Sequence, residues 1–256
     1  MKVFVVNLEK DIQKRRDITN ECNKSNIEFD IIKAISGATL KQDELDLLID
    51  KKAQFYLTKG EIGCSLSHLS IYKKIISDNI PYALILEDDA ILNDGINDVI
   101  SAIENIIDKE KNHAYLLYKT GCIYQNIEIK LSDKYSLYES NAPTYTHGYV
   151  ITNKTARLIT SINTPVRFEA DAWRNFYFEK NIRTYSLNLD LITSRDQSKE
   201  SSTIEEERLS RSEIQLKLRE SLDKKNTIMK FYHKIFRRPF LKKNQRERLS
   251  IKHLYL

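Results

Sequence analysis

The chain has 256 residues, of which 41% are hydrophobic, and it carries a formal net charge of +5. This apolar content supports a folded core and excludes a disordered chain, and the length suits one large α/β domain or two small ones. No stretch approaches the ~20 consecutive apolar residues of a membrane-spanning helix, and the first residues lack the apolar run and cleavage site of a signal peptide, so we expect a cytoplasmic protein.

The predicted elements alternate between strands and helices. Short apolar runs predict strands at 2–6, 27–35, 82–86, 114–118, 145–152 and 184–191. Helices are expected at 11–23, 43–49, 58–77, 96–109, 154–162 and 170–180, and the third of these opens with the capping-box pattern Thr58-Lys-Gly-Glu61. This alternation predicts an α/β fold with a mixed, mostly parallel sheet covered by helices.

Charge divides the chain near residue 224. Residues 224–256 contain eleven Lys or Arg and one acid, which gives this tail a charge of +10 and leaves −5 on residues 1–223. Before the tail, a helix is expected at 204–224, with exposed i,i+4 pairs such as Glu213 with Lys217. The tail mixes aromatic and cationic residues at helical spacing, which is typical of segments that bind an anionic membrane surface. Nucleic-acid binding and a solvated tail are the alternatives.

The three cysteines, Cys22, Cys64 and Cys122, are scattered and form no Cys-x-x-Cys pattern. This usage is typical of reduced thiols in a reducing compartment, and neither a zinc site nor a redox pair is expected. Cys64 is expected to pack as a small apolar residue.

The most informative feature is a strand that ends in three acids. The apolar run 82–86 is followed directly by Glu87, Asp88 and Asp89. Ligands bind at the carboxyl ends of strands in open α/β sheets, and adjacent carboxylates favour a hard cation such as Mg²⁺ or Mn²⁺, which keeps coordination sites for phosphate. If the strand continued, Glu87 and Asp89 would face alike. The alternative is a solvated acidic turn that caps the next helix.

Three motifs together resemble glycosyltransferase family 25. They are Val5-Val-Asn-Leu8 with Arg15-Arg16, Gly60-Glu-Ile-Gly-Cys-Ser-Leu-Ser-His68, and Leu84-Ile-Leu-Glu-Asp-Asp-Ala90. This family contains the lipooligosaccharide galactosyl- and glucosyltransferases of Gram-negative bacteria, and it is related to the collagen galactosyltransferases. The resemblance covers about residues 1–205 and does not include the basic tail.

The resemblance implies a GT-A type, Rossmann-like catalytic domain, which we expect at 1–203. The charge and spacing of the remaining residues separately predict a helical, basic, membrane-associating segment at 204–256. The resemblance also implies a UDP-sugar donor, a divalent cation and inversion at the anomeric carbon. The acid motif departs from a strict Asp-x-Asp pattern because Glu87 stands first. We therefore expect Asp89 first, and Asp88 second, to hold Mn²⁺ or Mg²⁺, with Glu87 and Asp88 also beside the donor.

Further donor contacts are expected from the other two motifs. Asn7 and Leu8 at the first strand end would hold the uridine, and Arg15 the phosphates, although a solvated helix face also explains an arginine there. Ser67 and His68 would lie beside the donor. For His68 the alternatives are acceptor binding, an acid role, or a buried histidine satisfied by hydrogen bonds.

His147 and Gly148 interrupt a strand, where a glycine permits close approach of the backbone to a ligand or marks a bulge. Residues 145–152 also resemble a family segment that borders the sugar site, so both residues are expected near the donor.

A second acid is required by mechanism, because inversion needs a carboxylate that takes the proton of the acceptor hydroxyl. Asp171 is the first candidate and Glu169 the second; charge compensation at a helix start is the alternative. Trp173, the sole tryptophan, would either stack on a sugar or pack in the core. The polar segment 196–203 is expected to be a lid or a plain linker.

The sequence therefore predicts a transferase that moves a sugar, galactose in first place, from a UDP-sugar to a lipooligosaccharide or related surface glycan, at the inner face of the inner membrane. The alternatives are UDP-glucose or another UDP-hexose as donor, and a catalytically silent basic binding protein. No nucleic-acid partner is expected, because a nucleic-acid binder has no use for three acids at a strand end.

Overall fold

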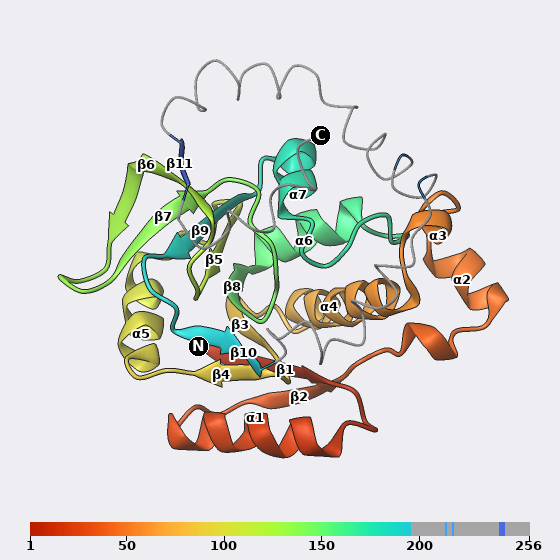
Figure 1. The fold of residues 1–256 in the computed structure, drawn as a ribbon, viewed down its shortest axis with the longest axis horizontal. Helices are drawn as coiled ribbons and strands as arrows, with labels where there is room; N and C mark the ends of the chain where they lie inside the picture. Colours follow the sequence, from red (N-terminus) through yellow and green to blue (C-terminus); the bar gives the residue numbers. More distant parts are fainter. Residues whose placement is uncertain (196–212, 214–216, 218–240, 244–256) are drawn as a thin grey trace.

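The structure is a computed structural model of the chain, and it describes residues 1–195, 213, 217 and 241–243 (Figure 1). The elements in chain order are β1 (Lys2–Asn7), α1 (Ile12–Lys24), β2 (Asp30–Lys33), the 3₁₀ helix η1 (Gly37–Thr39), α2 (Gln42–Leu48), α3 (Ala53–Tyr56), α4 (Lys59–Ser77), β3 (Tyr82–Glu87), β4 (Ala90–Leu92), α5 (Ile96–Ile106), β5 (His113–Leu116), β6 (Cys122–Lys130), β7 (Ser136–Ser140), β8 (Gly148–Thr152), α6 (Asn153–Ile162), α7 (Trp173–Lys180), β9 (Arg183–Leu187), β10 (Ile192–Ser194) and β11 (Leu241–Lys243).

Nine strands form one sheet in the order β11-β6-β7-β9-β5-β8-β3-β1-β2, and β4 pairs with β10 in a separate ribbon. β1 is parallel to β2 and to β3, and β5 is parallel to β9. The other five neighbouring pairs are antiparallel. The expected α/β fold with a mixed sheet is confirmed, but the expectation of a mostly parallel sheet is wrong. Strand β8 enters between β3 and β5 in the opposite direction, and β6 and β7 extend the sheet antiparallel to each other.

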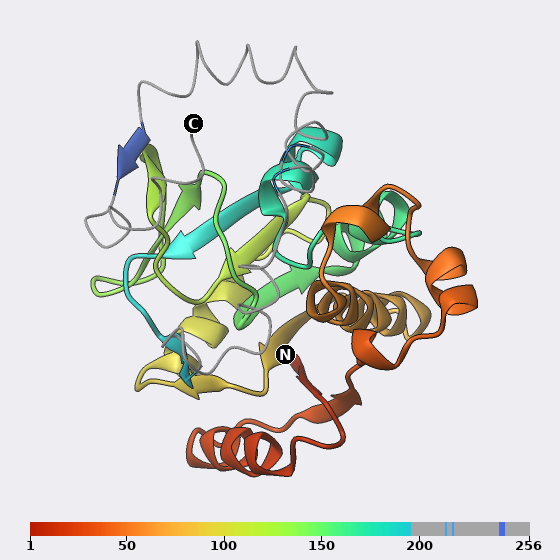
Figure 2. The same cartoon turned by 45° about the vertical axis from the view of Figure 1, so that its right-hand side comes forward.

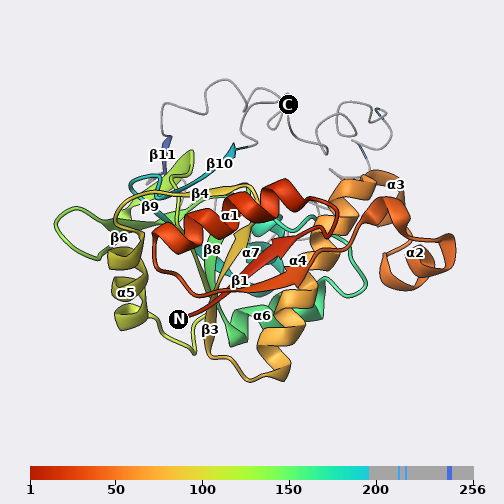
Figure 3. The same cartoon turned by 90° about the horizontal axis from the view of Figure 1, so that it is seen from below.

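Side chains of the central strands alternate between two apolar cores. Phe4 and Val6 of β1 enter the core beneath α4, α6 and α7, whereas Val3 and Val5 enter the core beneath α1 and α5. Helices therefore cover both faces of the sheet, with α1 and α4 on opposite sides (Figures 1 and 3). Strands buried on both faces have continuous apolar sequences, which is why 2–6 and 82–86 were recognisable. Among the helices of the described residues, none is long and apolar enough to cross a bilayer.

Helix α4 starts as predicted and is held close to the chain that follows β2 (Figure 2). The Glu61 N–H donates to Thr58 Oγ1 (3.1 Å) and the Thr58 N–H donates to Glu61 Oε2 (2.9 Å), which confirms the capping box. A Cβ on Gly63 would lie 2.6 Å from both the Gly37 nitrogen and the Ile35 carbonyl oxygen. Glycine at 63 thus lets two backbones pack without a side chain between them.

Several predicted boundaries differ from the structure for local reasons. The strand expected at 145–152 begins at Gly148, because Tyr145 has a φ of 73°, which is outside the extended region. The helix expected from 170 begins at Trp173. Strands β6 and β7 were not predicted, because β6 is polar and half-exposed beyond Tyr124 and so has no apolar run.

The C-terminal region is described at only a few positions. Glu213 and Lys217 are helical and form the expected i,i+4 ion pair, with Lys217 Nζ 3.2 Å from Glu213 Oε1. Residues 241–243 form β11, which is paired antiparallel with β6, so the segment expected to be helical throughout contains a strand here. The other expectations for 196–256, including the lid at 196–203, lie outside the described residues.

Candidate active site

The three acids after β3 turn toward three different partners. β3 ends at Glu87, and β1, which is parallel to it, ends beside it. Because the strand does not continue, Glu87 and Asp89 do not share one side. Glu87 contacts His68 of α4, Asp88 contacts Asn7 of β1, and Asp89 contacts Ser194 of β10. The acid motif therefore joins three parts of the fold at one edge of the sheet.

Asn7 and Asp88 connect the carboxyl ends of the two parallel strands. Asn7 is buried, and its Nδ2–H donates to Asp88 Oδ2 at 2.7 Å and to the Asp11 carbonyl at 3.3 Å. Burial raises the pKa of Asp88 and the amide of Asn7 opposes this rise. This pair lies where the sequence placed the nucleoside.

Asp89 is nearly buried, at 9% exposure, and is held by the chain around β10. The Ser194 hydroxyl donates to Asp89 Oδ2, and the backbone N–H of Arg195 donates to the Asp89 carbonyl at 2.9 Å. Arg195 in turn donates to the buried Glu21 of α1 at 2.8 Å. These contacts fix the direction of the Asp89 carboxylate.

The half-buried Glu87 and the buried His68 belong to one hydrogen-bonded chain. His68 Nε2 lies 3.3 Å from Glu87 Oε1, His68 Nδ1 lies 2.7 Å from the Tyr149 hydroxyl, and that hydroxyl lies 2.6 Å from the Tyr72 hydroxyl. The Thr146 hydroxyl also donates to Glu87 Oε1 at 2.5 Å. Burial alone would raise the pKa of Glu87, but the hydrogen bond and charge of His68, with Thr146, hold it below its ordinary value. Burial raises the pKa of Tyr149 well above 10.

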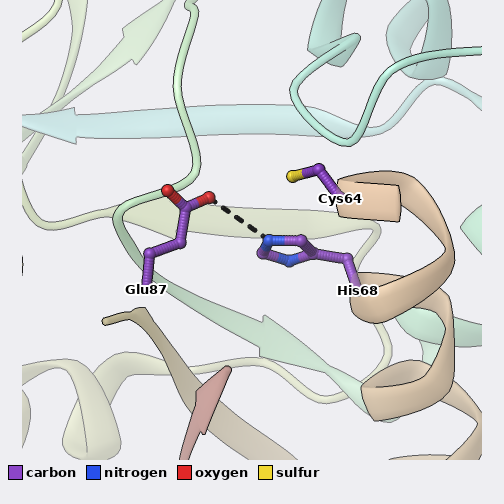
Figure 4. A group of neighbouring side chains, drawn as sticks. All are labelled: Cys64, His68 and Glu87. Carbon is purple, nitrogen blue, oxygen red and sulfur yellow. Dashed lines mark hydrogen bonds and ion pairs between the residues drawn. The ribbon is translucent and has the colours of Figure 1, made fainter. Parts of the chain in front are cut away.

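Cys64 completes a group of three potential metal ligands with His68 and Glu87. Their ligand atoms all lie within 4.8 Å of one another, and Figure 4 shows the sulfur, the imidazole and the carboxylate turned toward one another. Within residues 1–195, 213, 217 and 241–243, it is the one group of three or more His, Cys, Asp or Glu side chains with this spacing. Spacing rules based on paired cysteines miss it, because it has one cysteine and takes its carboxylate from another element.

Several residues of the motif at 60–68 hold α4 in place through different contacts. Glu61 caps α4, Gly63 permits the close backbone contact, and the Ser65 hydroxyl donates to the Phe168 carbonyl at 2.9 Å. The Ser67 hydroxyl donates to the Gly63 carbonyl (2.6 Å) and accepts from the Ile35 N–H (2.8 Å). These contacts give Ser67 a role in holding α4 in place; its expected contact with a donor stays a prediction.

Asp171, just before α7, supports an unusual loop residue. Asp171 Oδ2 accepts the backbone N–H of Tyr145 at 2.9 Å. The Tyr145 carbonyl accepts from the Tyr118 hydroxyl at 2.6 Å and from Trp173 Nε1–H at 3.1 Å. Tyr145 thus keeps a left-handed φ of 73°, a costly conformation for a bulky residue, while the residue is 61% exposed. Trp173 itself is buried against Tyr149, so its core-packing alternative holds.

His147 and Glu169 are both buried, and Gly148 is covered by a side chain. His147 Nε2 lies 3.2 Å from the Ile192 carbonyl oxygen, and burial lowers the pKa of His147. A Cβ on Gly148 would lie 2.4 Å from Ile192 Cδ1, and Gly148 is in regular register with Leu86. The glycine therefore makes room for Ile192 and marks no bulge.

Leu8 and Arg15 lie beyond the end of β1. Leu8 is half-buried next to Asn7, and Arg15 is exposed on α1, where it lines a shallow hollow with Glu9 and Ile12. The structure thus brings Asn7, Glu87, Asp88, Asp89 and His68 together at one edge, and it leaves Arg15 on the outer surface of α1.

Tyr145, Thr146 and Ser194 were missed as site residues by the sequence reasoning. Their roles come from contacts across at least 26 positions of chain, such as Tyr145 with Asp171 and Ser194 with Asp89. The available signal was the resemblance of residues 145–152, which include Tyr145 and Thr146, to a family segment; Ser194 had none.

Comparison with known proteins shows that the chain is similar to a family of sugar transferases. Residues 1–173 match the sequence model of glycosyltransferase family 25, which is described as an LPS biosynthesis protein. The match covers more than half of the chain, and the chain therefore belongs to glycosyltransferase family 25.

Individual relatives are more distant. The chain is 26% identical to procollagen galactosyltransferase 2 of Homo sapiens over 172 residues, which is 63% of this chain and 28% of that protein. It is 28% identical to lipooligosaccharide biosynthesis protein lic2B of Haemophilus influenzae over 101 residues, which is 40% of this chain and 38% of the relative. It is 32% identical to inactive glycosyltransferase 25 family member 3 of Mus musculus over 101 residues, which is 36% of this chain and 17% of that protein. The matches thus span well under half of each relative, and active and inactive descriptions both occur among them.

Proposed function

We propose that this chain is an inverting, metal-dependent glycosyltransferase of the GT-A type that transfers a hexose from a UDP-sugar to a lipooligosaccharide or related surface glycan. The observation that carries the proposal is the hydrogen bond between Asn7 and Asp88, because it joins two parallel strand ends at the edge where nucleotides bind in open α/β sheets. The names of the relatives favour galactose as the sugar and lipooligosaccharide as the acceptor; UDP-glucose or another UDP-hexose is the alternative donor.

The donor side is formed by the ends of β1 and β3. An amide beside a carboxylate offers the donors and acceptors that uracil and ribose hydroxyls require, and Asn7 with Asp88 presents this pair. The half-buried Leu8 adds apolar surface for the uracil. Glu87, with its partner His68, lies at the same edge of the sheet.

Asp89 is the first residue we assign to the divalent cation, and Asp88 the second. Mg²⁺ and Mn²⁺ with nucleotides use one or two carboxylates together with phosphate oxygens, so a full protein cage is not required. Asp89 fits because its carboxylate is nearly buried at the sheet edge and is oriented by Ser194. When bound, the cation supplies positive charge to the diphosphate as UDP leaves.

Asp171 is the proposed base, with Glu169 as the second candidate. Inversion places the acceptor hydroxyl opposite the departing UDP, so its base must be separate from the acids after β3. Asp171 is half-exposed and is oriented by the Tyr145 N–H, whereas Glu169 is buried at 7% exposure. The exposed ring of Tyr145 beside Asp171 provides a flat apolar surface for an acceptor sugar.

The second candidate function is a catalytically silent member of the same family, which the inactive mouse relative favours. The donor half-reaction separates the two. We expect the purified chain with Mn²⁺ to release UDP from UDP-galactose, or from another UDP-hexose in a panel, and excess chelator to abolish the release.

Asp89→Asn should abolish UDP release and keep the fold, because the amide is nearly isosteric but uncharged. Asp94→Asn, which changes an exposed acid five positions along, is the matched control and should retain activity. Full activity in excess chelator would contradict the metal assignment. No UDP release from any UDP-hexose, with or without a lipooligosaccharide acceptor, would support the silent alternative.

A further inference from the structure

Cys64, His68 and Glu87 place a sulfur, a nitrogen and an oxygen ligand around one point of the fold. Cys64 and His68 are one turn apart on α4, so their side chains lie on the same face of the helix. Glu87 reaches this face from the end of β3 (Figure 4). The group is separate from Asp88 and Asp89, whose carboxylates turn to β1 and β10.

The chemistry of the three ligands differs from that of a Mg²⁺ or Mn²⁺ site. A thiolate with an imidazole and a carboxylate suits Zn²⁺, whereas Mg²⁺ and Mn²⁺ prefer oxygen alone. We propose that Cys64, His68 and Glu87 bind a Zn²⁺-type ion at a second metal site, distinct from the cation site at Asp89. Three protein ligands leave a tetrahedral ion one open position for water or another oxygen.

The spacing of two of the ligands already fits such an ion. Zinc–nitrogen and zinc–oxygen bonds of about 2.0–2.1 Å at a tetrahedral angle place the two ligand atoms about 3.3 Å apart. His68 Nε2 and Glu87 Oε1 are 3.3 Å apart, which is long for a charge-assisted hydrogen bond of about 2.7–2.9 Å. The Cys64 sulfur, within 4.8 Å of both, needs a shift of at most about 1 Å to reach the edge length of about 3.6 Å expected for a zinc–sulfur bond of about 2.3 Å.

The surroundings hold the ligands in the orientation that metal binding requires. In the tautomer whose Nδ1–H donates to the Tyr149 hydroxyl, the Nε2 lone pair of His68 faces Cys64 and Glu87. A hydrogen bond to the second ring nitrogen is the usual support of a metal-binding histidine. Thr146 orients Glu87 in the same way. His68 is 1% exposed but Cys64 is half-buried, so an ion can enter from the Cys64 side.

Co²⁺ substitution tests the site without any sugar nucleotide. Metal-free full-length protein, kept reduced, is titrated with Co²⁺ and with Zn²⁺. We expect one Co²⁺ to give the near-ultraviolet absorption of a thiolate–cobalt bond, and Zn²⁺ to displace it. Cys64→Ser should remove this absorption, whereas Cys122→Ser, which changes a buried cysteine on β6, should retain it.

Tyr149→Phe tests the support of His68 separately. It keeps the buried ring and removes the hydroxyl that holds Nδ1, so Zn²⁺ affinity should fall ~10–100-fold while the thiolate–cobalt absorption remains obtainable at higher Co²⁺. Absence of the absorption in the wild-type protein, or its persistence in Cys64→Ser, would overturn the proposal. The Mn²⁺-dependent release of UDP is a different measurement, so the failure of either proposal leaves the other to be judged on its own data.

Discussion

Gly63→Ala tests whether the contact between α4 and the chain after β2 is as close as the structure shows. In an ordinary helix this change stabilises by about 1 kcal/mol, because alanine is the better helix former. Here the new Cβ would lie 2.6 Å from two backbone atoms, and these must move by about 0.8 Å to reach an ordinary contact distance of 3.4 Å. Forced expansion of a packed contact costs about 1–3 kcal/mol.

The same shift stretches the hydrogen bond from the Ile35 N–H to Ser67, which contributes about 1 kcal/mol. The repulsive effects therefore exceed the gain in helix propensity, and we expect Gly63→Ala to lower the free energy of unfolding by about 1–3 kcal/mol. Urea unfolding followed by circular dichroism measures it. Lys73→Ala, an exposed change on the same helix, should stay within about 0.5 kcal/mol of the wild type. A Gly63→Ala protein at least as stable as the wild type would refute the reasoning.

Three further predictions concern the base, the tail and pH. Asp171→Asn should lower turnover ~10²–10⁴-fold while the affinity for UDP stays nearly unchanged. The amide oxygen can still accept the hydrogen bond from the Tyr145 N–H, but it cannot take the proton of the acceptor hydroxyl. Loss of UDP binding would instead place Asp171 on the donor side. For the tail, the four cations between 230 and 238 are replaced by glutamine, which leaves β11 in the chain. Binding to anionic vesicles, measured by sedimentation, should weaken by roughly 1 kcal/mol per charge at low salt. Equal binding by the variant and the wild type would contradict membrane attachment. Burial, with Arg183 and Lys111, lowers the pKa of His113 from 6.5 to about 4, so the unfolded chain takes up its proton first. The free energy of unfolding should therefore decrease by on the order of 1–2 kcal/mol, allowing for solvent screening, as the pH drops from 6.5 toward 4. Urea unfolding of His113→Asn should show a smaller decrease over the same pH range. An identical decrease in the variant would exclude His113 as its cause.

The parts of the fold that the sequence predicted are those in which local pattern and burial agree. The strand before the acids was found because both of its faces are buried, and α4 was found because Thr58 and Glu61 cap it reciprocally. Strand β6 was not found because its residues beyond Tyr124 are polar and half-exposed, and the buried β7 was not found because Ser136, Glu139 and Ser140 interrupt any apolar run. The direction of β8 could not be predicted either, because a buried strand has the same apolar sequence whether it pairs parallel or antiparallel with its neighbours.

The candidate site divides in the same way. The acid motif and its position at a strand end were predictable, because three consecutive acids after an apolar run are visible in the sequence. The partners were not, because the turn after Glu87 sends each carboxylate to a different element. Tyr145 shows the limit most clearly, since its left-handed backbone is imposed by Asp171, Tyr118 and Trp173 rather than by its neighbours in the chain.

The contacts of Asp89 show where a shortened version of this chain can end without loss of the acid motif's surroundings. Sequence similarity to the family stops at residue 173, yet the side chain and the carbonyl of Asp89 are held by Ser194 and Arg195. A fragment that ends at 173 would also lack β9, which lies between β5 and β7 in the sheet. The match to the family and the contacts that hold Asp89 therefore end at different places in the chain. Any excised or fused version of this domain has to extend at least through Arg195 to keep its acid motif in place.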